Sequence, residues 1–463
     1  MNQEDALRTE IHQALDAIGD PTPNLLPGIM SRLRPGSHRR PMMVIGQAVA
    51  VLGIGLIVAA IVFSLHRSRV TPTTVTTSPS APIVAGPGAD IAWVTSQTQD
   101  RGDVVTGVDP AGHVVGRINA PIELRSPDGA HLYAVRGGAV ETYSALDGHR
   151  EQTVRLRGVG GVGPIPMLSP DGGYLAVVGG PATTLELVDL SMGRSVASIK
   201  VGSAAYVPII VGARANHIYV IGNETVVSVA FDGVKLRVEQ QTAGHTACDG
   251  LSIGGPNSAG GLPFRVLADG RTLAAFCPGD GRVTWFDLTR MALTHEVVVG
   301  QRNPFWVSPV FSPDGTTLYL HEGGTGALHL VDLVHQRLVT STKVAAAERN
   351  ALAWLGSLLV IPADAGGISR TAAVSPDNNW LYTVGAFGAQ GGVSLVHLPD
   401  LHIKGRWLPD IALESVWVSA DGQTIYLLSH GGDQLRALRT DGSEVARLNL
   451  PANTYGFVVP SVP

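Results

Sequence analysis

Ser312-Pro-Asp-Gly-Thr-Thr-Leu-Tyr-Leu320 joins a turn sequence to a short apolar strand, and variants of it recur along the chain. Proline fixes φ at the second turn position, aspartate caps the turn, and glycine accepts the left-handed conformation that closes a hairpin. The related turns are Ser126-Pro-Asp-Gly129, Ser169-Pro-Asp-Gly172, Ala268-Asp-Gly270, Ser375-Pro-Asp-Asn378 and Ser419-Ala-Asp-Gly422. We therefore interpret these residues as structural and not as catalytic: Asp128, Gly129, Asp171, Gly172, Asp269, Gly270, Asp314, Gly315, Asp377, Asp421 and Gly422.

The spacing of these turns predicts the architecture. Neighbouring copies lie 43 to 63 residues apart, and a degenerate copy, Ala213-Arg-Ala-Asn-His-Ile-Tyr219, fills the wide gap before Ala268. A period near 44 residues is typical of a four-stranded propeller blade. We predict an all-β propeller over residues 89–463 with eight blades, or with seven if residues 242–263 or 345–374 conceal a miscount.

The two ends of this region predict how the ring closes. Residues 91–94, 104–109 and 114–118 resemble the last three strands of a blade whose first strand is missing. The chain end, Tyr455-Gly-Phe-Val-Val-Pro460, supplies an unpaired strand. Pairing the two would remove the exposed edges that an open sheet presents for aggregation.

The repeat resembles a known class. Ser312–Leu320 and Val188-Asp-Leu-Ser-Met-Gly-Arg-Ser-Val-Ala-Ser-Ile-Lys-Val-Gly202 are similar to the two halves of the YVTN/YncE-like and WD40-like repeats of bacterial envelope proteins. The resemblance covers about residues 89–460 and implies a propeller, but this superfamily hosts many activities. The literal Tyr-Val-Thr-Asn strand end is missing, so no ligand role is carried over from it.

Residues 42–65 form an uncharged apolar run that is long enough, as a transmembrane helix, to cross about 30 Å of hydrocarbon. Arginines 32, 34, 39 and 40 precede it and only arginines 67 and 69 follow, and the side richer in basic residues stays in the cytoplasm. We therefore expect a single-pass protein of a bacterial cell membrane, with the repeats on the extracytoplasmic side. A cleaved signal peptide is the alternative, although the long preceding region fits it poorly.

Two short regions flank the predicted span. Residues 1–41 carry an amphipathic helical pattern and predict a cytoplasmic helical stub. Such a stub is too small to bury much apolar area alone, so we expect it to pack on itself, on the bilayer or on a cytosolic partner. Residues 66–88 are rich in Thr, Pro and Ser and predict an extended stalk.

Composition agrees with many short strands and turns, because the chain has 56 Gly and 30 Pro, is 44% hydrophobic and is only 15% charged. The net charge is −5, and no basic cluster follows Arg69. We therefore exclude nucleic acid as a partner, since phosphate binding needs a clustered basic face. Only four of the 33 basic residues are Lys, a bias that favours a bacterial source with a GC-rich genome.

The two cysteines, Cys248 and Cys277, lie in the predicted extracytoplasmic region. There they would oxidise to one disulfide that closes a loop of about thirty residues. Two buried free thiols are the alternative, and the spacing fits no CxxC or zinc motif.

Other motifs predict no chemistry. Gly250-Leu-Ser-Ile-Gly254 and Gly158-Val-Gly-Gly-Val-Gly163 match nucleophile-elbow and dinucleotide patterns, but no following helix is expected. His321, His329 and His335 have no carboxylate at ligand spacing, so we predict no metal site. The seven tryptophans are spread along the repeats, as expected for packing between blades.

The sequence therefore predicts a binding or scaffolding propeller that takes a protein or small-molecule ligand, with no cofactor and no catalytic residues. The alternative is a propeller-class envelope enzyme, such as a lactonase or a quinoprotein-like dehydrogenase, with Glu123, Arg125 and Glu414 near the inner strands as the candidates. A third possibility is a sensor whose function resides in residues 1–40.

Overall fold

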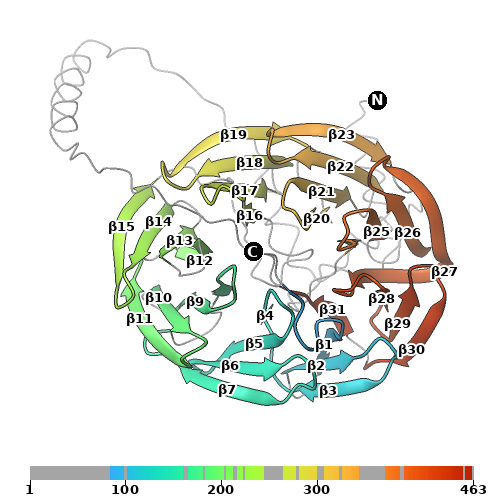
Figure 1. Cartoon of the computed structure of the whole chain (residues 1–463), viewed down its shortest axis with the longest axis horizontal. Helices are drawn as coiled ribbons and strands as arrows, with labels where there is room; N and C mark the ends of the chain where they lie inside the picture. The colour runs from blue at the N-terminus through green and yellow to red at the C-terminus, as the bar shows by residue number, and fades with distance from the viewer. Residues whose placement is uncertain are drawn as a thin grey trace, which may run out of the picture. The chain divides into compact units, whose positions relative to one another are not determined.

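The computed structural model describes residues 84–98, 102–159, 165–180, 183–202, 205–211, 216–222, 225–243, 264–277, 281–299, 307–322, 326–343, 371–385, 391–451 and 454–460. Every regular element among them is a β-strand (Figure 1). None of these residues belongs to a helix long and apolar enough to span a membrane. The predicted helices at 1–41 and 42–65 and most of the stalk lie outside the described residues.

The described strands form six four-stranded sheets and one seven-stranded sheet, arranged around a common axis (Figure 1). The sheet that joins the chain ends contains, in hydrogen-bonding order, β31 (Thr454–Val458), β1 (Ala92–Thr98), β2 (Gly102–Val108) and β3 (Val114–Ile118). The next two four-stranded sheets contain β4 (Leu124–Arg125), β5 (His131–Arg136), β6 (Ala139–Ser144) and β7 (Arg150–Arg155), and then β8 (Ile165–Leu168), β9 (Tyr174–Gly179), β10 (Thr184–Asp189) and β11 (Arg194–Lys200). The last three contain β12 (Ala205–Val211), β13 (His217–Gly222), β14 (Thr225–Phe231) and β15 (Leu236–Ala243); β16 (Phe264–Val266), β17 (Thr272–Cys277), β18 (Arg282–Asp287) and β19 (Ala292–Val298); and β20 (Val307–Phe311), β21 (Thr317–Glu322), β22 (Ala327–Asp332) and β23 (Arg337–Lys343). The seven-stranded sheet contains β24 (Ala372–Val374), β25 (Trp380–Val384), β26 (Gly391–His397), β27 (His402–Val418), β28 (Thr424–Ser429), β29 (Gln434–Arg439) and β30 (Glu444–Asn449).

The seven-stranded sheet corrects the predicted blade count. β27 continues unbroken for 17 residues, and its first part pairs with β26 while its second part pairs with β28. Leu408 takes a left-handed φ of 51°, and the register with β26 shifts nearby, so a bulge interrupts the regular extended backbone here while the strand itself continues. The structure therefore has six four-stranded blades and one continuous larger sheet, and the prediction of eight, or seven, separate four-stranded blades was wrong.

Hydrogen bonds explain why the Ser-x-Asp-Gly sequence recurs at the turns between first and second strands. In the turn after β20, Ser312 Oγ donates to Asp314 Oδ1 over 2.5 Å, and the same Oγ accepts from the Thr317 backbone at 2.9 Å. Gly315 closes the turn with a φ of 71°. The turns at Ser126, Ser169, Ser375 and Ser419 repeat both side-chain hydrogen bonds.

Apolar side chains fill the interfaces between successive sheets. Trp93 and Trp285 are fully buried, and each indole donates to a carbonyl of the next sheet, Ala145 at 2.9 Å and Leu333 at 3.0 Å respectively. A buried Trp retains its hydrophobic contribution only if its N–H finds a partner, so these bonds fix neighbouring sheets in register.

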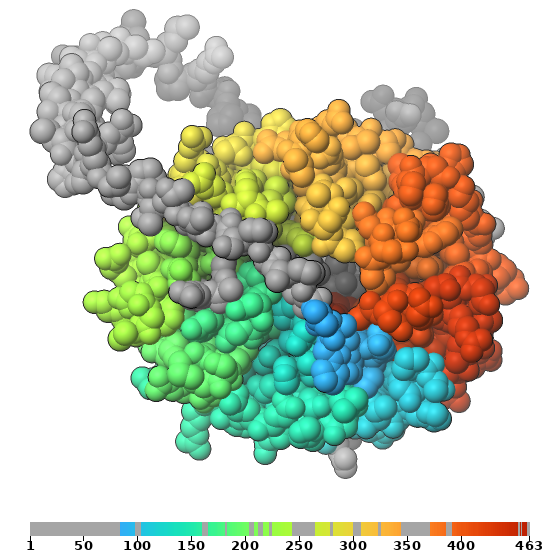
Figure 2. Space-filling view, in the orientation of Figure 1, coloured from blue at the N-terminus to red at the C-terminus, as the bar shows by residue number. Residues whose placement is uncertain are grey.

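The chain ends close the ring as predicted. β1 pairs antiparallel with β31, with Trp93 opposite Val458 and Val94 opposite Phe457. Figure 2 shows the blue N-terminal and red C-terminal segments side by side at this closure. The predicted pairing of the two ends is confirmed.

A second connection reinforces this closure on the side of the Ser-x-Asp-Gly turns. The segment 84–91, which we call the entry segment, places the Gly86 N–H on the Asp128 carbonyl at 2.7 Å. Farther along, the Asp90 carboxylate accepts from the Asp421 N–H, and the Asp90 carbonyl accepts from the Tyr426 hydroxyl. The entry segment thus links the β4–β7 blade to the seven-stranded sheet.

Candidate functional site

Three residues near the inner strands were the enzyme candidates, and the structure gives them different roles. Arg125 is fully buried in β4. Its Nε, Nη1 and Nη2 donate to the carbonyls of Gly129, Ile91 and Gly88 at 3.0, 3.1 and 2.6 Å. Arg125 therefore holds the entry segment to the ring and does not face a ligand.

Glu123 is an acid at an apolar position of the repeat. It lies three residues before the turn serine, where other copies have Pro166, Pro309, Ala372 and Val416. Its Oε2 is buried and has no hydrogen-bond partner among the described residues. Burial raises the pKa of Glu123 to about 8, although a hydrogen bond from the Val135 backbone opposes this shift.

Glu414 lies in β27 with its side chain mostly buried. It accepts from the Gly431 N–H at 3.3 Å and lies 3.3 Å from His430 Nδ1. Burial raises the pKa of Glu414 to about 7. Glu123 and Glu414 lie near different sheets, and among the described residues no hydrogen bond or ion pair joins either acid to the other or to Arg125.

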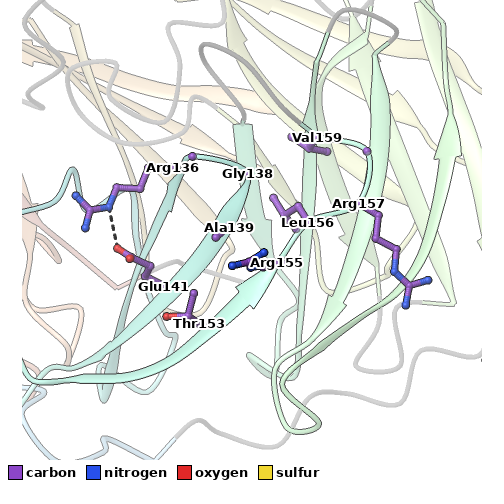
Figure 3. Close-up of a pocket in the computed structure, with 11 residues that line it drawn as sticks. Arg136, Gly138, Ala139, Glu141, Thr153, Arg155, Leu156, Arg157 and Val159 are labelled. Carbon is purple, nitrogen blue, oxygen red and sulfur yellow. Dashed lines mark hydrogen bonds and ion pairs between the residues drawn. The ribbon is translucent and has the colours of Figure 1, made fainter.

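A groove of about 1110 Å³ lies elsewhere, on the β4–β7 blade (Figure 3). It extends from the end of β5 across β6 and β7 to the segment that follows β7. The lining residues come from these four parts: Arg136, Gly137, Gly138, Ala139, Glu141, Thr153, Arg155, Leu156, Arg157, Gly158 and Val159. We call this feature the Arg155 groove.

Strand register explains which side chains form its floor. Ala139 lies opposite Arg155, and Glu141 lies opposite Thr153, so these four side chains share one face of the blade. The intervening residues Val140 and Val154 point to the other face, where they are buried in the core. The alternation therefore anchors the strands through their apolar face and leaves polar groups on the groove face.

One wall of the groove is a hydrogen-bonded ion cluster. Glu141 accepts from Arg136 Nε at 2.9 Å, from the Tyr143 hydroxyl at 2.7 Å and from Arg150 Nη1 at 3.2 Å. Burial would raise the pKa of Glu141, but the hydrogen bonds from Tyr143 and Arg136 outweigh it and lower that pKa. Arg136 also donates to the Asn119 carbonyl, so its guanidinium is fixed in place.

The opposite wall is fixed by Glu186, a fully buried carboxylate of β10. It accepts from the Arg157 N–H at 2.7 and 2.9 Å, from the Gly158 N–H at 2.9 Å and from the Ser195 hydroxyl. The Leu156 N–H also donates to the Gly138 carbonyl at 2.8 Å. The backbone that carries Arg155 and Arg157 is therefore held by its own blade through Gly138 and by the next blade through Glu186.

Arg155 and Arg157 are exposed. Within the described residues, neither guanidinium has an ion-pair partner. In Figure 3, Arg136 and Arg157 extend in opposite directions and Arg155 lies between them. The groove thus has three guanidiniums and one carboxylate in a chain of net charge −5, which makes it suited to an anionic ligand.

Sequence reasoning missed this groove. Gly158 and Val159 begin the dinucleotide-like motif, for which the sequence predicts no phosphate site. In the structure, the Gly158 N–H donates to Glu186. The rest of the motif lies outside the described residues. A usable signal was Glu186 itself, an acid in the apolar strand Leu185-Glu-Leu-Val-Asp-Leu190. A buried acid at such a position must have donors nearby.

The three histidines do not converge. His321 is fully buried, with Nδ1 3.3 Å from Thr371 Oγ1, and burial lowers the pKa of His321 to about 4. His329 contacts Glu322 at 3.0 Å, and His335 contacts Asp332 at 2.7 Å. No group of three or more potential metal ligands is present among the residues that the structure describes.

Of the two cysteines, Cys277 lies buried in β17 and forms a disulfide. Its predicted partner Cys248 lies outside the described residues, as does the motif at 250–254, so the pairing stays a prediction. The turn aspartates lie at the hairpins, where Asp171, Asp314, Asp377 and Asp421 each accept from the turn serine.

Comparison with known proteins supports the fold alone. No family model matches the chain, and no curated protein matches it. The dihydro-heme d1 dehydrogenase NirN in complex with DHE is similar in structure, with a TM-score of 0.56, 18% identity and coverage of 83% of this chain and 78% of that chain.

Two further structures have lower TM-scores and carry no argument. Hydrazine synthase of Kuenenia stuttgartiensis has a TM-score of 0.42 at 16% identity, covering 69% of this chain and 95% of that chain. The β-propeller domain of Cps50 (Swd1) from Myceliophteria thermophila has a TM-score of 0.43 at 9% identity, covering 66% and 92%. The comparisons therefore show a fold shared with the NirN structure and identify no activity.

Proposed function

We propose that this chain is a binding propeller that holds an anionic ligand in the Arg155 groove. The observation that carries the proposal is the pair of exposed guanidiniums, Arg155 and Arg157, on a backbone fixed by Glu186. Because this backbone is already fixed, binding a ligand has to order only the two side chains, and this smaller entropic cost favours recognition.

The groove lies away from the entry segment. The entry segment contacts Asp128 at the turn before β5, whereas Arg136 lies at the other end of β5. Six residues of strand separate the two ends, about 17–20 Å. The groove and the entry segment therefore lie at opposite ends of β5.

The location of the domain rests on the sequence alone. The arginine-rich flank of residues 42–65 favours an extracytoplasmic propeller, and the proposal keeps this location. A reporter fused after Pro463 tests it: a periplasm-active phosphatase gives activity if the domain is outside, whereas activity of a cytoplasm-only reporter would contradict the location.

Hydrogen exchange of the full chain tests the binding function. Acidic peptide, oligogalacturonate and inorganic phosphate serve as anionic probes. We expect at least one of them to slow exchange in residues 136–141 and 153–159, and R155E/R157E to abolish that protection. Arg194→Glu is the matched control, because Arg194 is an exposed arginine of β11 outside the groove. Protection confined to other blades, or no protection by any probe, would overturn the proposal.

A further inference from the structure

The shape and chemistry of the Arg155 groove narrow the class of ligand. The three guanidiniums do not meet at one point but are spread along the groove (Figure 3). A single small anion could contact only one of them closely, whereas an extended ligand with several carboxylates could reach more than one. The arrangement therefore favours a polyanion over inorganic phosphate.

The lining residues also favour a peptide over an acidic sugar as the ligand. None of the eleven lining residues is aromatic, so the groove has no ring on which a sugar could stack. Thr153 and Arg155 belong to β7, the outermost strand of its blade. In the part of the chain that the structure describes, β7 pairs with β6 alone, so its outer edge presents backbone N–H and C=O groups beside the groove.

An extended peptide satisfies both features. Its backbone can hydrogen-bond along an open strand edge, and its alternate side chains then point to one face, two residues apart. A carboxylate on that face would meet Arg155, which ends β7, and a further one beyond the strand end would meet Arg157 in the bend that follows. A planar carboxylate matches the guanidinium fork in two parallel hydrogen bonds.

Resting on the proposed function, we infer that the ligand is an acidic peptide segment of a partner protein, bound in extended conformation along β7 with its carboxylates on Arg155 and Arg157. The groove requires no helix or aromatic anchor in the partner. Its requirement is alternating acidic side chains on a strand-forming sequence.

Titration calorimetry on the full chain tests this inference with the acetylated hexapeptide Thr-Glu-Thr-Glu-Thr-Glu. Its control is the Thr-Gln repeat of equal length, which keeps the strand propensity and removes the charges. We expect the Glu peptide to bind, with affinity that falls as salt rises, and R155E/R157E to weaken it by roughly tenfold or more. Arg194→Glu should leave the affinity unchanged.

Other outcomes separate the inference from the proposed function. If oligogalacturonate or phosphate protects the groove and the Glu peptide does not bind, the peptide inference is wrong while the anionic groove stands. Equal binding of the Gln and Glu peptides would also overturn it, because the carboxylates would then contribute nothing. If none of the probes perturbs residues 136–159, both the inference and the proposed function fail.

Discussion

Arg125 and Trp417 meet at the closure of the ring, with the guanidinium carbon 5.5 Å from the centroid of the indole ring. Arg125 belongs to the blade β4–β7, Trp417 belongs to β27, and the pair therefore spans the β31–β3 blade that joins the two chain ends. A cation over an indole face is attracted by the ring quadrupole, more strongly where water is excluded. This contact gives Arg125 a structural role, whereas its position near an inner strand had made it a candidate catalytic residue.

Arg125→Met should destabilise the closure. It removes the guanidinium donors from the carbonyls of Gly88, Ile91 and Gly129, of which Gly88 keeps the Ile91 N–H, and the loss of several buried hydrogen bonds costs about 3 kcal/mol or more. Hydrogen exchange in residues 86–91 should therefore rise before the rest of the propeller opens. Arg117→Met, at an exposed position of β3, is the control and should change the unfolding free energy by no more than about 0.5 kcal/mol. Unchanged exchange in the entry segment would contradict this role.

Glu123→Gln should make the protein more stable at alkaline pH. The folded pKa of about 8 lies above the value near 4.5 of an exposed Glu, so the folded state keeps a proton that the unfolded state has lost. The unfolding free energy of the native chain should therefore fall as pH rises from about 4.5 through 8. Gln mimics the neutral acid and removes this loss, which reaches roughly 4–5 kcal/mol at pH 8.5.

Denaturant titration of both chains at pH 5 and pH 8.5 checks this prediction. The two should have similar free energies of unfolding at pH 5 and diverge at pH 8.5. Parallel pH profiles would show that Glu123 ionises in the folded protein as an exposed acid does.

His321→Val should remove an acid sensitivity. The folded pKa of about 4 lies below the ordinary 6.5, so the unfolded state binds a proton first and the native chain loses stability as pH falls from 6.5 toward 4. Valine fits the site, because equivalent positions of other repeats are Val135, Val178 and Val384. The hydroxyl pair of Ser308 and Thr371, 2.6 Å apart, stays in place.

We expect native and His321→Val chains to differ by no more than about 1 kcal/mol at pH 7.5, whereas the variant should be more stable at pH 5 by roughly 2 kcal/mol. Thermal unfolding over this pH range measures the difference. If the variant loses stability equally on acidification, another group is responsible.

Glu186→Ala should loosen the Arg155 groove. The substitution leaves the Arg157 and Gly158 N–H groups and the Ser195 hydroxyl without an acceptor, each at a cost of about 1–3 kcal/mol while it stays buried. Exchange in residues 156–159 should rise and affinity for anionic probes should fall, even though Glu186 does not line the groove. Glu296→Ala, which removes an exposed carboxylate of β19, should do neither. Retention of full probe affinity by Glu186→Ala would show that the groove does not depend on this anchor.

The sequence by itself determined the all-β repeat, its turns and the pairing of the chain ends. Each of these depends on local chemistry that a short segment contains: a serine and an aspartate that cap one turn, a glycine at positive φ, and an alternation of apolar and polar side chains. The pairing of β1 with β31 also followed, because an incomplete blade at one end and a lone strand at the other have complementary edges.

Only the tertiary structure decided the sheet count, the roles of the inner polar residues and the position of the groove. β27 continues through a bulge at Leu408 and pairs on both sides of it, and a repeat period gives no information on whether a strand is shared. Arg125 and Glu123 are two residues apart, yet one is saturated with carbonyls and the other has a buried oxygen without a described partner. The groove is lined by residues from β5, β6 and β7 and from the segment after β7, and Glu186 in β10 holds that segment by hydrogen bonds. This grouping exists only once the two sheets pack together.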